Sequence, residues 1–236
     1  MKLSIDTLYA QHCTMFGRRN RFRFRGIEAR VNYLMDQART VQDGIRKKVP
    51  KDKMERRLVR LLSRIFCVAD YYGSDLGLAE GFARKWLGSC AYCGCIPCEC
   101  QETRKAPVLP QAVPAEVGWS LAEVCTHLNK LYGDKNRVSG LDYLVTRLFS
   151  EVAEVSSVTS NLPFTQGSHD ELEEMLVGEL SDGIAWTIAL ANELGIDLEE
   201  GWAKLYASGC PRCTQQICQC GPFFIRNGAV QIASSG

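Results

Sequence analysis

The chain has 236 residues, of which 46% are hydrophobic and 23% charged, and its formal net charge is +1. That is an ordinary globular composition, long enough for one or two domains with real cores. No apolar run approaches the roughly 20 residues needed to span a bilayer, and residues 1–13 lack the apolar core of a signal peptide. We therefore expect a cytoplasmic protein with no membrane partner.

The small net charge hides an uneven distribution along the chain. Residues 1–100 hold 19 Lys and Arg against 10 Asp and Glu, whereas residues 101–236 hold 9 against 17. A basic half is compatible with nucleic-acid binding. Attraction between a basic and an acidic half explains the same asymmetry, and we favour that interpretation.

The sequence contains an internal repeat, which has to be recognised before the fold is predicted. The matching segments, in chain order, are LSI (3–5) with WSL (119–121), MFG (15–17) with LYG (131–133), GIE (26–28) with GLD (140–142), ADYYGSDL (69–76) with ANELGIDL (191–198), and EGFARKW (80–86) with EGWAKLY (200–206). We call residues 1–102 the first copy and residues 119–221 the second copy. A Pro-rich linker, 103–118, separates them, and a tail follows at 222–236.

The second copy shows its helices most clearly. Ser120 and Glu123 form a capping box that opens a helix over 121–132, with Gly133 as its stop. Apolar residues recur with a period of 3.6 over 141–157 and again over 170–194, and Asp197 precedes a last helix over 198–207. Strand patterns are nearly absent. These patterns predict an all-α protein made of two tandem four-helix bundles, each followed by a small Cys-rich knuckle.

Two acidic pairs mark the candidate active site: Glu151 with Glu154, and Glu179 with Asp182. Residues three apart share one face of a helix, so two facing helices would gather four carboxylates. Solvated surface charges are the alternative, but both pairs border apolar stripes, where unpaired charges are unfavourable. Four clustered carboxylates favour a hard cation such as Mg²⁺, which binds through carboxylates and substrate phosphates.

The spacing E-x-x-E followed by E-x-x-D resembles the MazG-like nucleoside triphosphate pyrophosphohydrolases, a family that includes all-α dUTP and dCTP pyrophosphatases. The segment GELSDGIAWTIALANELGIDLEEGWAKLY (178–206) is similar to the last two helices of that family. The resemblance covers 119–207 well and 3–87 in degenerate form. It implies hydrolysis of a nucleoside triphosphate to a monophosphate and pyrophosphate, with Mg²⁺ held by Glu151, Glu154, Glu179 and Asp182.

The resemblance also implies substrate-binding residues. Lys204 occupies the position of a phosphate-contacting lysine, Trp186 that of an aromatic near the base, and His127 faces the same region in some relatives. This chain departs from the family at Ser208, where relatives often carry asparagine, so the contacts with phosphate or sugar stay open.

The first copy lacks the acids. Gln37 and Thr40 stand opposite Glu151 and Glu154, and Arg57 and Arg60 stand opposite the other pair. Because arginines cannot replace metal ligands, we expect this copy to be catalytically inactive. Family members commonly form dimers whose bundles complete each other, so we expect the first copy to act as a built-in partner. A homodimer of the whole chain stays open.

Two cysteine clusters share the spacing C-x2-C-x4-C-x-C. They consist of Cys90, Cys93, Cys98 and Cys100, and of Cys210, Cys213, Cys218 and Cys220. Four closely spaced thiolates suit one structural Zn²⁺ per cluster, with Cys95 as a spare thiol. Disulfides are disfavoured in a cytosolic chain, and an iron–sulfur cluster is the other four-cysteine alternative.

Two other functions compete with the enzyme. The stretch RRNRFRFR (18–25) alternates arginine with aromatics, which suits single-stranded nucleic acid next to zinc knuckles, although the acidic second half argues against it. A non-catalytic nucleotide sensor would use the same acidic residues. The preferred base and sugar are not specified by the sequence.

Overall fold

Helices dominate the computed structural model, which describes residues 2–73, 76–100, 118–161 and 169–220 together with strands 223–226 and 229–232. The elements in these ranges are α1 (Ile5–Arg23), α2 (Ile27–Arg46), α3 (Lys51–Ala69), α4 (Leu78–Trp86), α5 (Leu121–Asn161), α6 (His169–Glu193), α7 (Leu198–Tyr206), β1 (Phe223–Arg226) and β2 (Ala229–Ile232). The all-α prediction is confirmed. The two strands form an antiparallel hairpin in the tail, which the sequence patterns did not predict.

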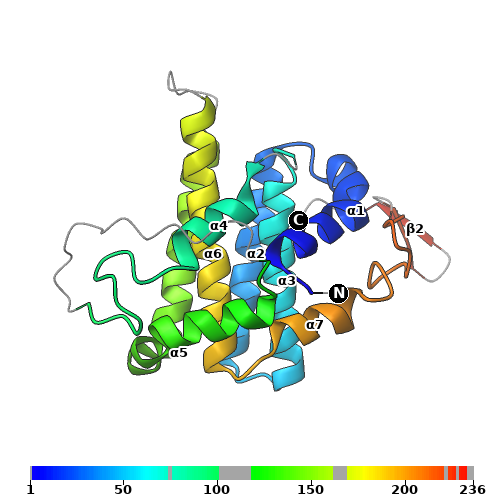
Figure 1. Ribbon diagram of the computed structural model, residues 1–236. Coiled ribbons are helices and arrows are strands. Elements are labelled where there is room, and N and C mark those ends of the chain that lie inside the picture. Colours follow the sequence, from blue (N-terminus) through cyan, green and yellow to red (C-terminus); the bar gives the residue numbers. More distant parts are fainter. Residues whose placement is uncertain are drawn as a thin grey trace.

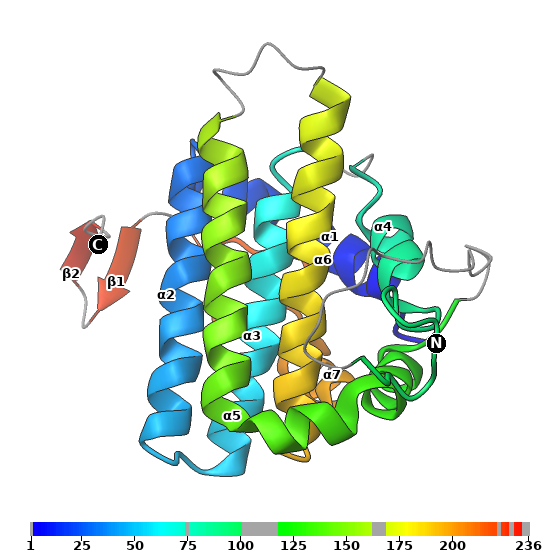
Figure 2. The same cartoon turned by 90° about the vertical axis from the view of Figure 1, so that its left-hand side faces the viewer.

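Four long helices form the centre of the molecule. Figure 2 shows α2, α3, α6 and the second half of α5 standing side by side, and each packs against two of the others. Their apolar stripes meet in one core, which contains Leu34, Leu62, Leu148 and Leu180 at 1% exposure or less. The central bundle therefore takes two helices from each copy.

The short helices are exchanged between the copies. Helix α4 of the first copy packs on α6 of the second, and α7 of the second packs on α3 of the first (Figures 1 and 2). Glycines at matching repeat positions permit both close approaches. A Cβ on Gly81 would come within 2.1 Å of Val177, and a Cβ on Gly201 within 2.8 Å of Glu55. The two copies are thus related by a two-fold pattern of contacts.

The cysteine clusters are exchanged in the same way, because each one packs on the other copy. The Cys98 N–H donates to the Leu131 carbonyl at 2.9 Å, and the Cys218 N–H donates to the Met15 carbonyl at 2.8 Å. Met15 and Leu131 are equivalent in the repeat, so each cluster rests on the first helix of the other copy. The copies therefore share one core and are not two self-contained bundles. The boundaries drawn at 102 and 118 stay predictions, and the linker up to 117 lies outside the described residues.

The ends of the helices agree with the sequence signals except at one glycine. The capping box forms, with the Glu123 N–H donating to Ser120 Oγ at 3.2 Å and the Ser120 N–H donating to Glu123 Oε2 at 2.7 Å. Asp197 caps α7. The predicted stop at Gly133 is wrong, because α5 continues through it and bends at Gly140, whose φ of 77° favours glycine.

None of the helices among the described residues is long and apolar enough to cross a bilayer.

Candidate functional site

The acidic residues come together where α5 meets α6. Carboxylate oxygens of Glu151, Glu154 and Glu179 all lie within 4.8 Å of one another. Asp182 follows one turn after Glu179 and acts electrostatically on both Glu151 and Glu179. Glu151 is only 3% exposed. We call these four residues the acidic cluster. The structure thus brings three of the four predicted ligands into one set, with Asp182 beside it.

Two cations and two indoles flank the acidic cluster. Lys85 Nζ lies 2.6 Å from Asp182 Oδ1, and the Trp86 indole donates to the same oxygen at 3.2 Å. On the other side, Arg147 Nη2 donates to Glu151 Oε1 at 2.9 Å and the Trp186 indole donates to it at 3.2 Å. These donors fix the carboxylates of Asp182 and Glu151. Lys85 and Trp86 belong to α4 of the first copy. The first copy therefore contributes two side chains to the acidic site of the second copy.

The carboxyl groups of Glu151, Glu179 and Asp182 resist ionisation. Burial, followed by the neighbouring charges of Glu154 and Asp182, raises the pKa of Glu179 from 4.5 to about 7. Burial and then Asp182 raise the pKa of Glu151, against the opposing effect of Arg147. Burial also raises the pKa of Asp182, against the hydrogen bond from Lys85. Like charges raise each other's pKa in this way where no cation separates them.

The donor set fits a hard divalent cation. Its oxygens come from carboxylates on two rigid helices, and their mutual distances of up to 4.8 Å allow one ion to reach several of them. Among the described residues, the ion pairs of the four carboxylates are those with Lys85 and Arg147, so carboxylates outnumber cations in the cluster. A divalent cation would relieve that repulsion.

Two residues that the resemblance assigned to substrate have partners outside the acidic cluster. Lys204 Nζ is 3.0 Å from Glu200 and 3.7 Å from Glu55, on α7 where it packs against α3. The structure therefore brings Lys85, and not Lys204, to the carboxylates. His127 Nε2 lies 3.0 Å from the Gly88 carbonyl oxygen, and its ring packs edge-on against Trp119.

Sequence reasoning missed Lys85, Trp86 and Arg147. The repeat itself contained a signal for the first two, because Lys85 and Trp86 match Leu205 and Tyr206. Because one copy has lysine where the other has leucine, this position is expected to make different contacts in the two copies.

The matching site of the first copy is held together without metal. Gln37 Nε2 donates to the Arg57 carbonyl at 3.0 Å, and Arg57 Nη1 donates to the Thr40 carbonyl at 2.6 Å. The neighbours Arg56 and Arg64 donate to Asp52 and to the Tyr33 hydroxyl. Hydrogen bonds within the first copy thus replace the carboxylates, and these arginine contacts do not lead to the acidic cluster.

An apolar pocket of about 310 Å³ adjoins the acidic cluster. Trp86 and Trp186, which donate to Asp182 and Glu151, also line this pocket. We call it the aromatic pocket. Its lining residues comprise the rings of Trp86, Tyr92, Tyr132, Tyr143 and Trp186, the polar side chains of Lys135, Asn136, Ser139 and Asn192, and the small or apolar Cys90, Cys98, Cys100, Leu128, Ala185 and Ala189.

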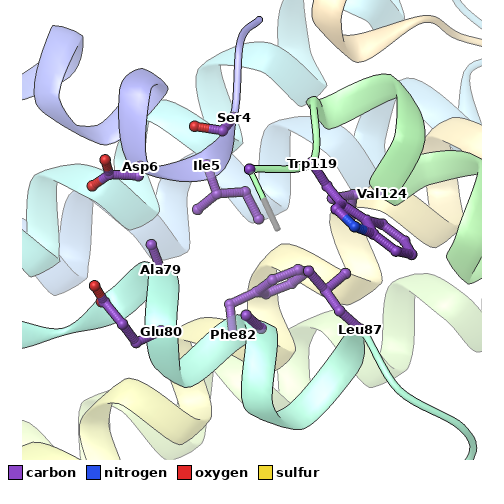
Figure 3. Close-up of a pocket in the computed structure, with 11 residues that line it drawn as sticks. Ser4, Ile5, Asp6, Ala79, Glu80, Phe82, Leu87, Trp119 and Val124 are labelled. Carbon is purple, nitrogen blue, oxygen red and sulfur yellow. The ribbon is translucent and has the colours of Figure 1, made fainter. Parts of the chain in front are cut away.

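A second pocket, of about 210 Å³, lies between the starts of α1 and α5 and helix α4 (Figure 3). Figure 3 shows Asp6 and Glu80 on one side and Trp119 on the other. Its lining side chains include these two carboxylates and no basic group. This pocket is therefore unsuited to a phosphate ester.

Each cysteine cluster brings four Sγ atoms within 4.8 Å of one another. The Sγ atoms of Cys90 and Cys100 are 3.6 Å apart, and those of Cys210 and Cys220 are 3.9 Å apart. A tetrahedral site with Zn–S bonds of about 2.3 Å needs sulfurs about 3.8 Å apart, whereas a disulfide needs about 2.05 Å. Both clusters could therefore hold zinc. Cys95 stands apart, with its thiol directed at the Cys93 carbonyl.

Backbone amides prepare the clusters for metal. The N–H groups of Cys95 and then Glu99 lower the pKa of the Cys93 thiol to about 6. Burial and the neighbouring thiols raise the pKa of Cys100 and of Cys220 to about 12. The Cys93 thiol therefore ionises readily, while a bound cation is needed to keep all four thiols of the cluster as thiolates.

Zinc removal is expected to destabilise the fold, because each cluster ties the end of one copy to the first helix of the other. Metal analysis should find two zinc ions per chain, and Cys93→Ser should reduce this to one. A strong chelator should lower Tm by on the order of 10 °C, measured by calorimetry with zinc add-back as control. Visible absorption with bound iron would instead indicate an iron–sulfur cluster.

No family, no curated protein and no solved structure was found to match this chain.

Proposed function

We propose that the chain is an Mg²⁺-dependent nucleoside triphosphate pyrophosphohydrolase that acts through its second copy. The observation that carries this proposal is the convergence of Glu151, Glu154 and Glu179 at one point, with Lys85 on Asp182 beside them. Carboxylates for a cation, a lysine for phosphate oxygens and an adjoining aromatic pocket together match the parts of such a substrate. The resemblance to MazG-like enzymes supports the same conclusion.

The reaction transfers the nucleotidyl group to water. Water oxygen forms a bond to the α-phosphorus, the bond from that phosphorus to the α–β bridging oxygen breaks, and pyrophosphate leaves. The water proton passes to a carboxylate of the acidic cluster. The products are a nucleoside monophosphate and pyrophosphate.

Mg²⁺ supplies charge neutralisation at the triphosphate and makes the attacking water more acidic. Glu151 is buried and accepts bonds from Arg147 and Trp186, so it offers a fixed ligand oxygen. Glu154 is the exposed member of the cluster and is placed to orient the water. Within the described part of the chain, Lys85 and Arg147 pair with the cluster and are available to bind phosphate oxygens of the substrate.

Pyrophosphate release from a panel of ribo- and deoxynucleoside triphosphates with Mg²⁺ tests the proposal. The wild-type protein should turn over at least one nucleotide. Glu179→Gln keeps the shape of the side chain but removes its charge, so turnover should fall about 1,000-fold. Glu174→Gln changes an exposed carboxylate of the same helix outside the cluster and should leave turnover unchanged.

Absence of turnover from folded, zinc-loaded wild-type protein would refute the enzyme. If that protein still bound nucleotides in the presence of Mg²⁺, the sensor alternative would take its place. If both Gln variants retained full activity, the acidic cluster would not be the catalytic site.

A further inference from the structure

The aromatic pocket is suited to a flat, uncharged ring. Five aromatic side chains and two asparagines line it, and no carboxylate is among its lining residues. Edge-to-face ring pairs stand on two sides, Trp86 with Tyr132 at 5.8 Å and Tyr143 with Trp186 at 6.3 Å between centroids. Apolar surface with a few polar groups is typical of small-molecule sites. The acidic cluster lies next to this pocket. With a divalent cation bound, it would suit the triphosphate end of a nucleotide.

The repeat provides an internal comparison for this pocket. Phe16 and Tyr206 match Tyr132 and Trp86, and they form the same edge-to-face pair at 5.7 Å. Next to them, the first copy contains a closed polar network. His12 Nδ1 lies 3.0 Å from Ser63 Oγ, and the Asn20 amide nitrogen lies 3.3 Å from His12 Nε2.

That network also reaches a buried ion pair. The Asn20 amide donates to Asp70 at 3.3 Å, and Arg30 pairs with Asp70 at 2.9 Å. His12, Asn20 and Ser63 are fully buried. In the first copy, therefore, the polar groups next to the ring pair satisfy one another.

The second copy keeps one amide of this network, carries a second amide where the first copy has Asp70, and lacks the polar partners. Asn136 and Asn192 match Asn20 and Asp70, whereas Leu128 and Ala185 replace His12 and Ser63. All four line the aromatic pocket. The Asn192 amide nitrogen donates to the Cys125 carbonyl at 3.0 Å, which leaves its side-chain oxygen to accept from a ligand. Amides that offer both donors and acceptors match the edge of a nucleobase.

The first cysteine cluster is a wall of this pocket. Cys90, Cys98 and Cys100 line it, together with Tyr92 from the same knuckle. The wall is held by the backbone bond from Cys98 to Leu131 and by a hydrogen bond from Lys135 to the Cys100 carbonyl. Metal in this cluster would fix the wall, whereas the second cluster lies against α1 and contributes no residue to the pocket lining.

We propose that the aromatic pocket binds the nucleoside part of a nucleotide and that metal in the first cysteine cluster, but not in the second, sets nucleotide affinity. The inference rests on the proposed function for the phosphate end of the ligand. It assigns the degenerate first copy a role in substrate recognition, through Trp86 and Tyr92.

Two probes separate the nucleoside from the phosphates. The first is a nucleoside triphosphate analogue with a methylene bridge between the α- and β-phosphates, and the second is inorganic triphosphate. Binding is measured by titration calorimetry with Mg²⁺, and the quenching of tryptophan fluorescence gives a second readout. Asn136→Ala should weaken the nucleotide analogue about tenfold and leave inorganic triphosphate unchanged.

The repeat supplies a matched pair of cysteine variants, Cys93→Ser and Cys213→Ser, neither of which changes a pocket-lining residue. Cys93→Ser should weaken the analogue about tenfold or more without weakening inorganic triphosphate. Cys213→Ser should change neither affinity.

Equal effects of the two cysteine variants on the analogue, or full affinity in Asn136→Ala, would overturn the inference and leave the proposed function standing. The same holds if the wild-type protein binds inorganic triphosphate as tightly as the analogue. If the wild-type protein binds neither probe, the proposed function fails together with the inference.

Discussion

Lys85→Met is expected to lower kcat/KM for the preferred nucleoside triphosphate about 100-fold. Methionine keeps the length and apolar character of the stem but removes the ammonium group that lies 2.6 Å from Asp182. In the proposed enzyme this ammonium binds phosphate oxygens as charge builds up on the leaving pyrophosphate. Steady-state kinetics with saturating Mg²⁺ measure the change.

Lys204→Met is the matched control, because Lys204 lies on the equivalent short helix and pairs with Glu200 and Glu55. Its kcat/KM should stay within about twofold of wild type, since exposed ion pairs contribute little. A loss in Lys204→Met without one in Lys85→Met would contradict the exchange of short helices at the site. If Lys85 only neutralises Asp182, Lys85→Met should tighten Mg²⁺ binding and leave kcat unchanged.

The secondary structure could be predicted because its signals are local. The period of 3.6 in α6, the capping box at Ser120 and the cap at Asp197 depend on residues within one or two turns. Gly133 was misjudged for a related reason. A glycine inside a helix costs about 1 kcal/mol, which the neighbouring turns of α5 offset, and only the positive φ at Gly140 ends the regular helix.

The pairing of helices could not be predicted from periodicity. The stripe on α4 shows which side chains are buried but not which long helix they face, and EGFARKW and EGWAKLY have nearly the same pattern. Charge distinguishes the two arrangements. Without exchange, Lys85 would take the place of Leu205 on α3, the helix that carries Arg57 and Arg60, whereas the exchange places it against Asp182. The acidic residues of α5 and α6 were found from sequence because each pair is local, but the lysine beside them depends on this long-range choice.

Glu179→Gln is expected to stabilise the metal-free protein while it abolishes stabilisation by Mg²⁺. The pKa of Glu179 is raised from 4.5 to about 7, so the fold disfavours its charged form. The resulting penalty is fully present above pH 7 and fades as the pH falls toward 4.5. Because Glu179 is only half-buried, solvent screening reduces this penalty to on the order of 1 kcal/mol, or about 2–4 °C in Tm at pH 8.

Mg²⁺ is expected to reverse the order of the melting temperatures of wild type and Glu179→Gln. At 100 times its Kd, a ligand that binds only the folded state adds about 2.7 kcal/mol, so wild-type Tm should rise by about 5–10 °C and exceed that of Glu179→Gln. Calorimetry at pH 8, with and without Mg²⁺, measures both effects, and Glu174→Gln should follow wild type in each. A lower Tm for Glu179→Gln than for wild type without metal would contradict this prediction. It would mean that nearby cations already stabilise the charged Glu179 carboxylate, so that repulsion within the acidic cluster does not favour Mg²⁺ binding. The crossing of the two melting temperatures therefore tests the cation site independently of any nucleotide.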